Sequence, residues 1–491
     1  MQTQDPFQSL YRNRLQEGSF SVSEGPETSG SGYFSFRGLR ISRVGFGGYR
    51  IGLSDPEHRE ALEYSLESGV NLVDVSANYG DGEAEGLVGD ILSQKAEEMR
   101  EFRKKIFIVT KAGYIQGRNL RVLEAREKEG RGFSEITRYQ NGLFHCISPD
   151  FLEDQLERSR KRLGVFTIDG FLLHNPEYYL MLEEKKGQRR EEARKEYYRR
   201  IRTAFGFLER ARKEGKIRYY GISSNTFPVP EDRFTHTSLS KVLQMAKEAG
   251  GEEHGFAIVQ FPGNWYEDGF LRNKNSEGRT ILDLCEENTL LPLINRPLNS
   301  FREGIGMLRL SYSPGKKEPD LSKVLQNFSS EAAIIERLED SEGLPSLSGL
   351  WSEYGDRIQT EEQFQILLER SWIPELRKTI DRIHSESGKA DAEEYIGILN
   401  ATLPRLSEVL RQRGEEKLSS LYENLSERFP NPNPPKSLSS LMVSHLASLL
   451  SHGSVLLGMR RRHYVDDILP LFRNPWSKIS SKHWGEHGIR S

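Results

Sequence analysis

The 491-residue sequence has few cysteines, almost no net charge and no long apolar run, and each shortage excludes a class of protein. Two cysteines, Cys146 and Cys285, are too few for a disulfide framework or a four-cysteine zinc or iron–sulfur site. The 69 Lys and Arg residues nearly balance the 72 Asp and Glu residues, so the net charge of −3 offers no basic field to nucleic acid. No apolar stretch approaches the roughly 20 residues of a membrane span, and the N-terminal MQTQDPFQSL lacks a signal-peptide core. We therefore expect a soluble, cytoplasmic protein that binds neither nucleic acid nor membrane.

Metal-ligand spacing is also missing. Histidines such as His58, His236 and His384 form no H-x-x-x-H or Cys/His pattern, and we predict no metal site. The charged run at 181–200 alternates in sign and lacks regularly interleaved aromatic residues, which indicates a solvated helix face.

What the sequence does contain is an alternation of short apolar runs with amphipathic helical stretches, from residue 33 to about residue 301. The clearest helix is 149–163, which we expect Ser148 to cap, Pro149 to start and Gly164 to end. Strands that are separated by helices lie parallel and are joined by right-handed crossovers. We predict eight strands, the last near the C-terminus: RVGFGG (43–48), VNLVDVS (70–76), IFIVTK (106–111), TIDGFLLH (167–174), IRYYGIS (217–223), FAIVQF (256–261), LLPLINRP (290–297) and SVLLG (454–458).

Residues 302–436 interrupt this alternation. They contain helical stretches such as 321–339 and 361–384 but no strand pattern, and they close with NPNPP (431–435), which no helix or central strand tolerates. The sequence therefore predicts an α/β fold, a (β/α)8 TIM barrel with an N-terminal β-hairpin and an all-helical insertion. A doubly wound sheet is the alternative. The predicted domains are a flexible arm (1–32), the barrel (33–301 and 437–491) and the insertion (302–436).

Polar or glycine-rich residues end every predicted strand. The active site of a TIM barrel lies at the C-terminal ends of its strands, and an ionisable group there is costly to bury unless it is paired. The doubly wound alternative explains this pattern less well, because Gly45-Phe46-Gly47 is followed by Arg50 where a dinucleotide loop requires glycine. The strand-end residues are Gly47-Gly48, Asp74, Lys111, His174, Ser223-Ser224-Asn225, Gln260, Asn295-Arg296, and Gly458 with Arg460.

Four of these segments suggest acid–base chemistry. Tyr79 follows Asp74 by five residues, and a phenol with a pKa of about 10 needs a nearby cation to act as an acid–base catalyst near neutral pH. Lys111 can supply that charge, Asp74 can hold the lysine, and His174 can donate a hydrogen bond to a substrate oxygen. A lowering of the tyrosine pKa by about two units corresponds to roughly 2.7 kcal/mol. This group suits protonation of a carbonyl oxygen, and no serine or cysteine is arranged for acyl transfer.

These residues resemble the aldo-keto reductases. The resemblance covers residues 33–301 and 437–469 and is carried by five motifs: D-x-x-x-x-Y-G-x-x-x-x-E (Asp74, Tyr79, Gly80, Glu85), T-K (Thr110, Lys111), L-x-H-N-P (Leu172, His174, Asn175, Pro176), E-G-K-I-R to G-I-S-S-N (214–225), and V-L-L-G-M-R (455–460). It implies a (β/α)8 barrel, NADP(H) or NAD(H) as the hydride carrier, Tyr79 as general acid, and Asp74, Lys111 and His174 as its catalytic partners.

The resemblance also implies a cofactor site. Ser224, Asn225 and Gln260 are expected to hold the nicotinamide carboxamide, and a basic helix start after the eighth strand suits a 2′-phosphate. A solvated basic helix start is the alternative for these arginines. Where many members carry an aromatic residue that stacks on the nicotinamide, this chain has Asn295-Arg296. The other predicted cofactor-binding residues are Gly48, Asn295, Arg296, Gly458, Met459, Arg460, Arg462 and Asp467.

Two functions follow from these patterns. The first is an NADP(H)-dependent oxidoreductase, an aldo-keto reductase that interconverts a carbonyl (aldehyde, ketone or sugar) and an alcohol, with Tyr49, Tyr114 and Trp265 as substrate-binding residues. Trp265 can equally cover the barrel rim. The second is a cofactor-binding sensor or scaffold whose insertion, 302–436, binds a protein partner; a lid or a passive bulge are the other interpretations of the insertion.

Overall fold

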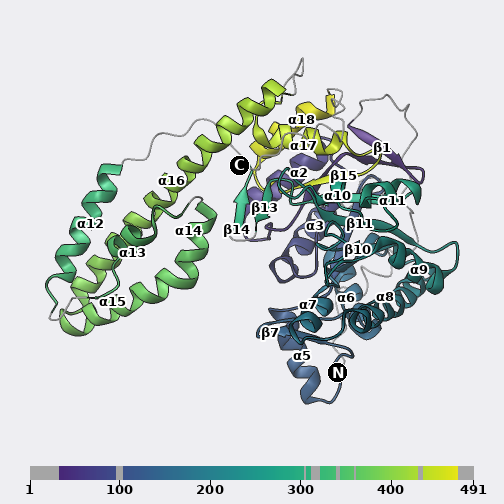
Figure 1. The fold of residues 1–491 in the computed structure, drawn as a ribbon, viewed down its shortest axis with the longest axis horizontal. Coiled ribbons are helices and arrows are strands. Elements are labelled where there is room, and N and C mark those ends of the chain that lie inside the picture. The colour runs from purple at the N-terminus through teal and green to yellow at the C-terminus, as the bar shows by residue number, and fades with distance from the viewer. Residues whose placement is uncertain are drawn as a thin grey trace. The chain divides into compact units, whose positions relative to one another are not determined.

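The structure is a computed structural model, and it describes residues 32–94, 103–302, 306–310, 321–338, 343–358, 361–428 and 435–473. The chain divides into two units, Met1–Pro297 with Ser440–Ser491, and Leu298–Ser439 (Figure 1). The predicted flexible arm lies outside the described residues apart from Gly32, as does NPNPP apart from its last proline. Within the described ranges, no helix is both long enough and apolar enough to cross a membrane.

The first unit is a closed barrel of eight parallel strands, which confirms the predicted fold class. Around the barrel the neighbours run β3, β4, β5, β9, β10, β11, β12 and β15, and each strand overlaps its predicted run. The strands are β3 (Val44–Gly47), β4 (Leu72–Asp74), β5 (Phe107–Ala112), β9 (Ile168–His174), β10 (Ile217–Ser223), β11 (Phe256–Pro262), β12 (Leu291–Asn295) and β15 (Ser454–Leu457).

Helices follow the strands, as the crossover rule requires. Helix α8 shows why they pack on the barrel, because Tyr197, Ile201, Phe205 and Leu208 recur at helical spacing and all four are buried. The helices of this unit are α2 (Pro56–Glu67), α3 (Glu83–Gln94), α5 (Arg118–Lys128), α6 (Pro149–Leu163), α7 (Tyr178–Lys185), α8 (Arg190–Lys213), α9 (Leu239–Gly250), α10 (Gly269–Arg272), α11 (Ile281–Glu287), α17 (Leu438–Ser448) and α18 (Arg462–Arg473).

Helix α6 tests the predicted start and stop signals directly. Pro149 opens the helix, and Gly164 ends it in the left-handed conformation at φ 64°, as expected. The predicted cap is wrong: Ser148 occupies the capping position, but its side chain makes no hydrogen bond to the helix backbone. Its hydroxyl donates to the side chain of Asp150 in the first turn of the helix.

The N-terminal hairpin, β1 (Tyr33–Phe36) and β2 (Leu39–Ser42), closes one end of the barrel. Its apolar side chains belong to the same buried cluster as Leu72, Phe107 and Leu291, which begin their strands. The hairpin therefore covers the N-terminal ends of the strands, and the polar residues at the opposite, C-terminal ends remain for a functional site.

The second unit starts with a hairpin that the sequence pattern did not predict. Strands β13 (Asn299–Arg302) and β14 (Gly306–Arg309) pair antiparallel, so the prediction of an all-helical segment is wrong at its beginning. The reason is that two four-residue strands are too short for a period-2 pattern to stand out. Helices follow: α12 (Leu321–Ile335), α13 (Leu347–Tyr354), α14 (Glu361–Leu367), the π-helical turn η2 (Leu368–Trp372), α15 (Ile373–Glu386) and α16 (Lys389–Arg428).

This helical unit has a core of its own. Phe364, Trp372 and Tyr395 are fully buried in it, and they come from α14, η2 and α16. The buried carboxylate of Glu331 on α12 accepts from the backbone N–H groups of Leu347 (2.6 Å) and Ser348 at the start of α13. These bonds satisfy N–H groups that a helix start leaves without intrahelical partners.

Candidate active site

The barrel places the predicted catalytic residues at one end. Asp74 ends β4, Lys111 lies one residue before the end of β5, and His174 ends β9. Strand register adds the next neighbours, because Ser223 at the end of β10 pairs with both His174 and Gln260. Strand order and register alone therefore bring the polar residues of five consecutive strands together.

Asp74, Lys111 and Tyr79 form a connected group. The Nζ atom of Lys111 lies 2.7 Å from Oδ2 of Asp74 and 3.3 Å from the hydroxyl oxygen of Tyr79, and it also donates to the carbonyl of Val75 at 2.9 Å. The lysine side chain is completely buried. All three ammonium protons therefore have acceptors, and one of those acceptors is the phenol.

A tight turn returns Tyr79 to the strand ends. The short helix η1 (Tyr79–Gly82) follows β4 directly, and Gly80 and Asp81 adopt φ values of 57° and 54°. This left-handed conformation suits glycine, which explains Gly80 in the motif. Glu85, the last residue of the motif, has a structural role: its buried carboxylate accepts from Thr110 and pairs with Arg162, so it links α3 to β5 and α6.

Burial and the neighbouring charges act in opposite directions on the pKa values of Asp74 and Lys111. Burial raises the pKa of Asp74 above its usual value, although the ammonium of Lys111 partly opposes it. Burial alone would lower the pKa of Lys111, but Asp74 and Tyr79 outweigh it, so the pKa of the lysine is raised. Lys111 therefore stays protonated and provides a fixed positive charge beside the phenol.

The pKa of Tyr79 moves in the opposite direction to the sequence-based expectation. Burial raises it above 10, and the ammonium of Lys111 only partly offsets this effect. The expected net lowering is therefore wrong for the structure, because the cost of removing a phenolate from water exceeds the attraction of one ammonium. The phenol is held in its protonated form, which is the form a general acid requires.

His174 is a neutral ring in this group. Burial, and then the charge of Lys111, lower the pKa of His174 well below its usual value. Its Nδ1 lies 3.1 Å from the hydroxyl of Ser76, and its ring contacts those of Tyr79 and Tyr114, with centroids 5.9 and 4.8 Å away. Ser76 was not among the predicted site residues, although it lies between Asp74 and Tyr79 in the sequence.

His145 is a second residue that the sequence analysis missed. It lies on β8 (Leu143–His145), which pairs with β6 (Tyr114–Ile115) and β7 (Thr137–Gln140) in the connection after β5. Its Nε2 lies 2.7 Å from the backbone carbonyl of His174, and burial lowers its pKa to about 4. His145 thus supports the backbone beneath His174. No spacing rule connects two histidines 29 residues apart.

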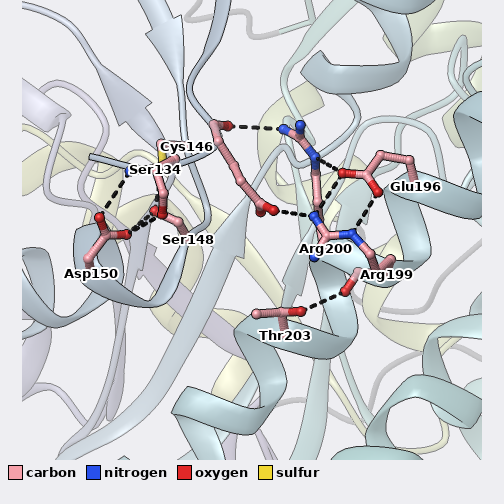
Figure 2. A network of polar contacts seen from close by, with 9 residues as sticks. Ser134, Cys146, Ser148, Asp150, Glu196, Arg199, Arg200 and Thr203 are labelled. Carbon is pink, nitrogen blue, oxygen red and sulfur yellow. Dashed lines mark hydrogen bonds and ion pairs between the residues drawn. The ribbon is translucent and has the colours of Figure 1, made fainter. Parts of the chain in front are cut away.

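Polar contacts attach the segment between β5 and α6 to the helices α6 and α8 (Figure 2). Asp150 on α6 accepts from both the backbone and the hydroxyl of Ser134, and the thiol of Cys146 donates to the carbonyl of Ser134. Glu135 accepts from Arg199 and Arg200 of α8. Burial raises the pKa of Cys146 to about 11, so this cysteine remains a thiol.

Gln260 joins the catalytic group to the predicted nicotinamide site. Its Nε2 donates to Oδ1 of Asp74 at 2.8 Å, and its Oε1 accepts from Ser223 at 2.8 Å and from Asn295 at 3.3 Å. Oδ1 of Asn295 is buried and has no hydrogen-bond partner among the described residues. The structure thus brings Asn295 and Gln260 together and leaves one buried acceptor unused.

Ser224 and Asn225 follow β10 in the adjoining loop. The hydroxyl of Ser224 lies 3.0 Å from that of Thr226, whereas the side chain of Asn225 is exposed. Buried Glu177 fixes this loop by accepting from the backbone N–H of Asn225 and from the side chain of Asn175, both at 2.8 Å. Glu177 is a further residue absent from the predictions.

The predicted phosphate-binding segment lies at the start of α18. Met459 is buried, Gly458 is exposed, and Arg460 and Asp467 are partly buried. Arg462 lies over the ring of Tyr64 at 4.0 Å and pairs with Glu60 of α2. Arg461, which was not predicted, pairs with Asp55 (3.1 Å) and with Glu57 (2.5 Å). Acidic residues of α2 and its cap thus already neutralise two arginines of this segment.

Of the remaining predicted residues, some contact the catalytic group and others have partners elsewhere. Tyr49 is 64% exposed and its ring centroid lies 5.1 Å from that of Tyr79, so it joins the group, as Tyr114 does. Gly48, the residue after β3, donates its N–H to the carbonyl of Asp74. Trp265 packs against His445 of α17, and Arg296 pairs with Glu267.

Across the described ranges, no cluster of three or more His, Cys, Asp or Glu residues is placed to hold a metal.

The geometry defines an α/β barrel with an acid–base group at the C-terminal ends of its strands. The model of the aldo/keto reductase family matches residues 43–295, which is more than half of the chain and all but the last barrel strand. The chain belongs to the aldo/keto reductase family.

Individual relatives are more distant. The chain is 26% identical over 144 residues to the NADH-specific methylglyoxal reductase of Escherichia coli (strain K12), a match that covers 28% of this chain and 39% of the relative. It is 25% identical over 194 residues to an aldo-keto reductase of Gibberella moniliformis (strain M3125 / FGSC 7600), covering 38% of this chain and 45% of the relative. The chain therefore spans less than half the length of these curated relatives.

Among solved structures, the glycerol dehydrogenase AKR11B4 from Gluconobacter oxydans aligns with 94% of this chain and 97% of its own, at 17% identity and a TM-score of 0.47. An aldo/keto reductase from Klebsiella pneumoniae in complex with NADP and acetate aligns with 92% of this chain and 94% of its own, at 14% identity and a TM-score of 0.41.

Proposed function

We propose that this chain interconverts a carbonyl and an alcohol with a nicotinamide cofactor, and that Tyr79 is the general acid and base. The observation that carries the proposal is the contact of Lys111 Nζ with both Asp74 (2.7 Å) and the hydroxyl oxygen of Tyr79 (3.3 Å). A buried ammonium beside a phenol stabilises the phenolate that remains once the phenol has given up its proton.

The residues at the strand ends fit a nicotinamide group. Oδ1 of Asn295 is a buried acceptor that has no donor among the residues the structure describes, and the amide of a nicotinamide carboxamide is such a donor. Asn295, Gln260, Ser224 and Asn225 would hold this end of the cofactor. When bound, the nicotinamide supplies the hydride for reduction or accepts it in oxidation.

The protein residues have separate tasks in this scheme. Tyr79 accepts a hydrogen bond from Lys111 through its oxygen, so its own O–H can donate to the substrate oxygen. In reduction, the O–H bond of Tyr79 breaks and its proton bonds to that oxygen. Asp74 keeps Lys111 charged and oriented. The ring of His174 lies beside that of Tyr79, so His174 would border a substrate oxygen bound there.

NADP(H) is the proposed cofactor, with NAD(H) as the alternative. Gly458, Met459, Arg460 and Arg462 would lie along the adenosine phosphates, together with Asp467 and Gly48. The ion pairs of Arg461 with Asp55 and Glu57 oppose a 2′-phosphate at that position, and the relative from E. coli is named NADH-specific. We also propose Tyr49 and Tyr114 as substrate contacts, because their rings adjoin those of Tyr79 and His174.

The insertion 302–436 is proposed as a separate domain of the enzyme. It has its own apolar core and its own buried hydrogen bonds, which a segment serving only as a loop would lack.

The test is the replacement Tyr79→Phe, with Tyr219→Phe on β10 as the matched control. Oxidation of NADPH and of NADH is followed against a panel of carbonyls that includes methylglyoxal, and reduction of the oxidised cofactors against the matching alcohols. Loss of the general acid should lower kcat by about 10²- to 10⁴-fold, whereas the control removes the hydroxyl of a tyrosine whose ring packs against Phe36 of the N-terminal hairpin and should change kcat little. Unchanged turnover in Tyr79→Phe would refute the proposal.

A further inference from the structure

The turn that follows Tyr79 is left-handed and rich in glycine. Three successive residues, Gly80, Asp81 and Gly82, have positive φ values of 57°, 54° and 95°. Glycine adopts many conformations and so does not fix the turn, while a residue with a side chain is unfavourable in this region. Such a turn keeps one conformation only when contacts from outside determine it.

Asp81 makes such a contact. It is the one residue of the three with a side chain, and its Oδ2 accepts from the backbone N–H of Arg118 at 3.2 Å. Arg118 is the first residue of α5, and Gly117 before it gives that helix no side-chain cap. Asp81 therefore caps α5 from a position 37 residues before Arg118, and its negative charge also suits the positive end of the helix dipole.

Gly117 provides the space for this carboxylate. A Cβ atom at residue 117 would overlap both carboxylate oxygens of Asp81. Gly117 also has φ 53° and ψ −123°, a conformation that suits glycine alone. The acceptor on the turn and the missing side chain before α5 therefore belong to one contact, and this contact joins the Tyr79 turn to the connection that carries Tyr114 on β6.

We propose that Asp81 is a positioning residue for Tyr79: by capping α5 it fixes the turn and so keeps the phenol beside Lys111. The inference rests on the proposed role of Tyr79 as general acid and base. The hydroxyl oxygen of Tyr79 has to stay near Nζ of Lys111, which lies 3.3 Å away. A displacement of about 1 Å at a reacting group can lower a rate by up to about 10²-fold.

Two substitutions remove this contact from opposite sides. Asp81→Gly removes the acceptor and leaves a residue suited to positive φ, and Arg118→Pro removes the donor at a position where a helix accepts proline. We expect each to lower kcat for carbonyl reduction about tenfold and to change KM less than twofold, because the acid is displaced while the substrate contacts remain. Both remove the same hydrogen bond, so the double variant should be no slower than the slower single variant. A double variant whose loss is the product of the two single losses would overturn the proposal.

Two further variants separate positioning from the loss of a helix cap. Asp81→Asn keeps an acceptor oxygen and tolerates the left-handed conformation, so kcat should stay within about twofold of the wild type. Ser346→Gly removes a cap of the same kind in the helical unit, where Oγ of Ser346 accepts from the N–H of Gly349 at 3.0 Å, and turnover should be unchanged. If Asp81→Asn is as slow as Asp81→Gly, or if Ser346→Gly is equally slow, the proposal is wrong.

The position of Tyr79 can also be observed without substrate. The protein is labelled with 3-fluorotyrosine, and the ¹⁹F NMR signal of Tyr79 is identified by its loss in Tyr79→Phe. We expect this signal to shift or broaden in Asp81→Gly and Arg118→Pro and to stay unchanged in Asp81→Asn, while circular dichroism shows that each variant is folded. An unchanged signal in Asp81→Gly would overturn the proposal. The absence of turnover by the wild type on all substrates would refute the proposed function, whereas the ¹⁹F signal would still decide whether Asp81 positions Tyr79.

Discussion

Two tyrosines, one in each unit, each share a hydrogen bond with an ionised group, and the two groups have opposite charges. Tyr79 in the barrel lies 3.3 Å from the ammonium of Lys111, and Tyr395 in the helical unit lies 2.8 Å from the carboxylate of Glu331. Burial raises the pKa of both phenols. The ammonium partly offsets that rise at Tyr79, whereas the carboxylate adds to it at Tyr395.

The hydrogen bonds differ in the same way. Tyr395 is the donor to Glu331, so its proton is already committed within the protein. Tyr79 is the acceptor from Lys111, so its proton remains to be given away. Burial beside a charge is therefore no indication of catalysis by itself. The sign of the charge and the direction of the hydrogen bond separate a reactive phenol from a structural one.

Removing the ammonium should have the largest effect. Lys111→Met leaves the carboxylate of Asp74 buried without its ion partner, and breaking a buried pair in this way costs about 3–5 kcal/mol of unfolding free energy. We also expect turnover to fall at least as far as in Tyr79→Phe, because the phenolate loses its stabilising charge. Urea unfolding and the carbonyl assay measure the two effects.

The double variant Asp74→Asn/Lys111→Met is the control for this prediction. It removes both charges together, so it should recover part of the lost stability without recovering turnover. A double variant that regains activity would mean that the charge of Lys111 serves only to neutralise Asp74.

The corresponding change in the helical unit should separate stability from activity. Tyr395→Phe removes one donor from the buried carboxylate of Glu331, which should cost about 1–3 kcal/mol of unfolding free energy. Turnover at a temperature where the variant is folded should equal that of the wild type. A loss of turnover in the folded variant would show that Tyr395 matters to the reaction and that the two tyrosines do not differ in role.

Much of the barrel could be predicted from the sequence because its strands are buried apolar runs that end in polar residues. Asp74, Lys111 and His174 could be found for the same reason, since ionisable residues at such positions require partners. The hairpin β13–β14 and the small sheet of β6, β7 and β8 could not, because their strands are only two to four residues long.

The sequence did not predict every residue of the site or the direction of every pKa shift. Ser76 and His145 were missed because each contacts His174 only in the folded chain, and no spacing rule connects them with it. The direction of the pKa shift at Tyr79 depends on whether burial or Lys111 contributes more, which requires coordinates. Asn295 was recognised as a departure from the family pattern, yet its contact with Gln260 became evident only in the folded chain.

Exposed ion pairs should contribute far less free energy than the buried pair of Asp74 and Lys111. In Glu57→Gln, Arg461 loses a partner in a pair whose side chains are 34% and 59% exposed, and such pairs contribute about 0.2–1 kcal/mol. The affinity for NADP(H) should therefore rise by about two- to fivefold relative to NAD(H), as measured by fluorescence titration. Glu63→Gln on the same helix pairs with Arg59 instead and is the control. Equal shifts in both variants would exclude a role for Arg461 at the 2′-phosphate.

The smallest expected effect is that of pH on kcat/KM for carbonyl reduction. Reduction needs Tyr79 protonated, and because burial raises the pKa of this phenol above its usual value, Tyr79 stays protonated at neutral and mildly alkaline pH. The pKa of His174 is lowered, so this ring stays neutral as the pH falls through 6.5. We therefore expect kcat/KM for reduction to be constant from about pH 6.5 to 9 and to decline only above that range. A decline with a midpoint near pH 8 would mean that Lys111 outweighs burial in setting the pKa of Tyr79 in the working enzyme. The pKa values of Tyr79 and Tyr395 would then differ more than the structure of the chain alone indicates.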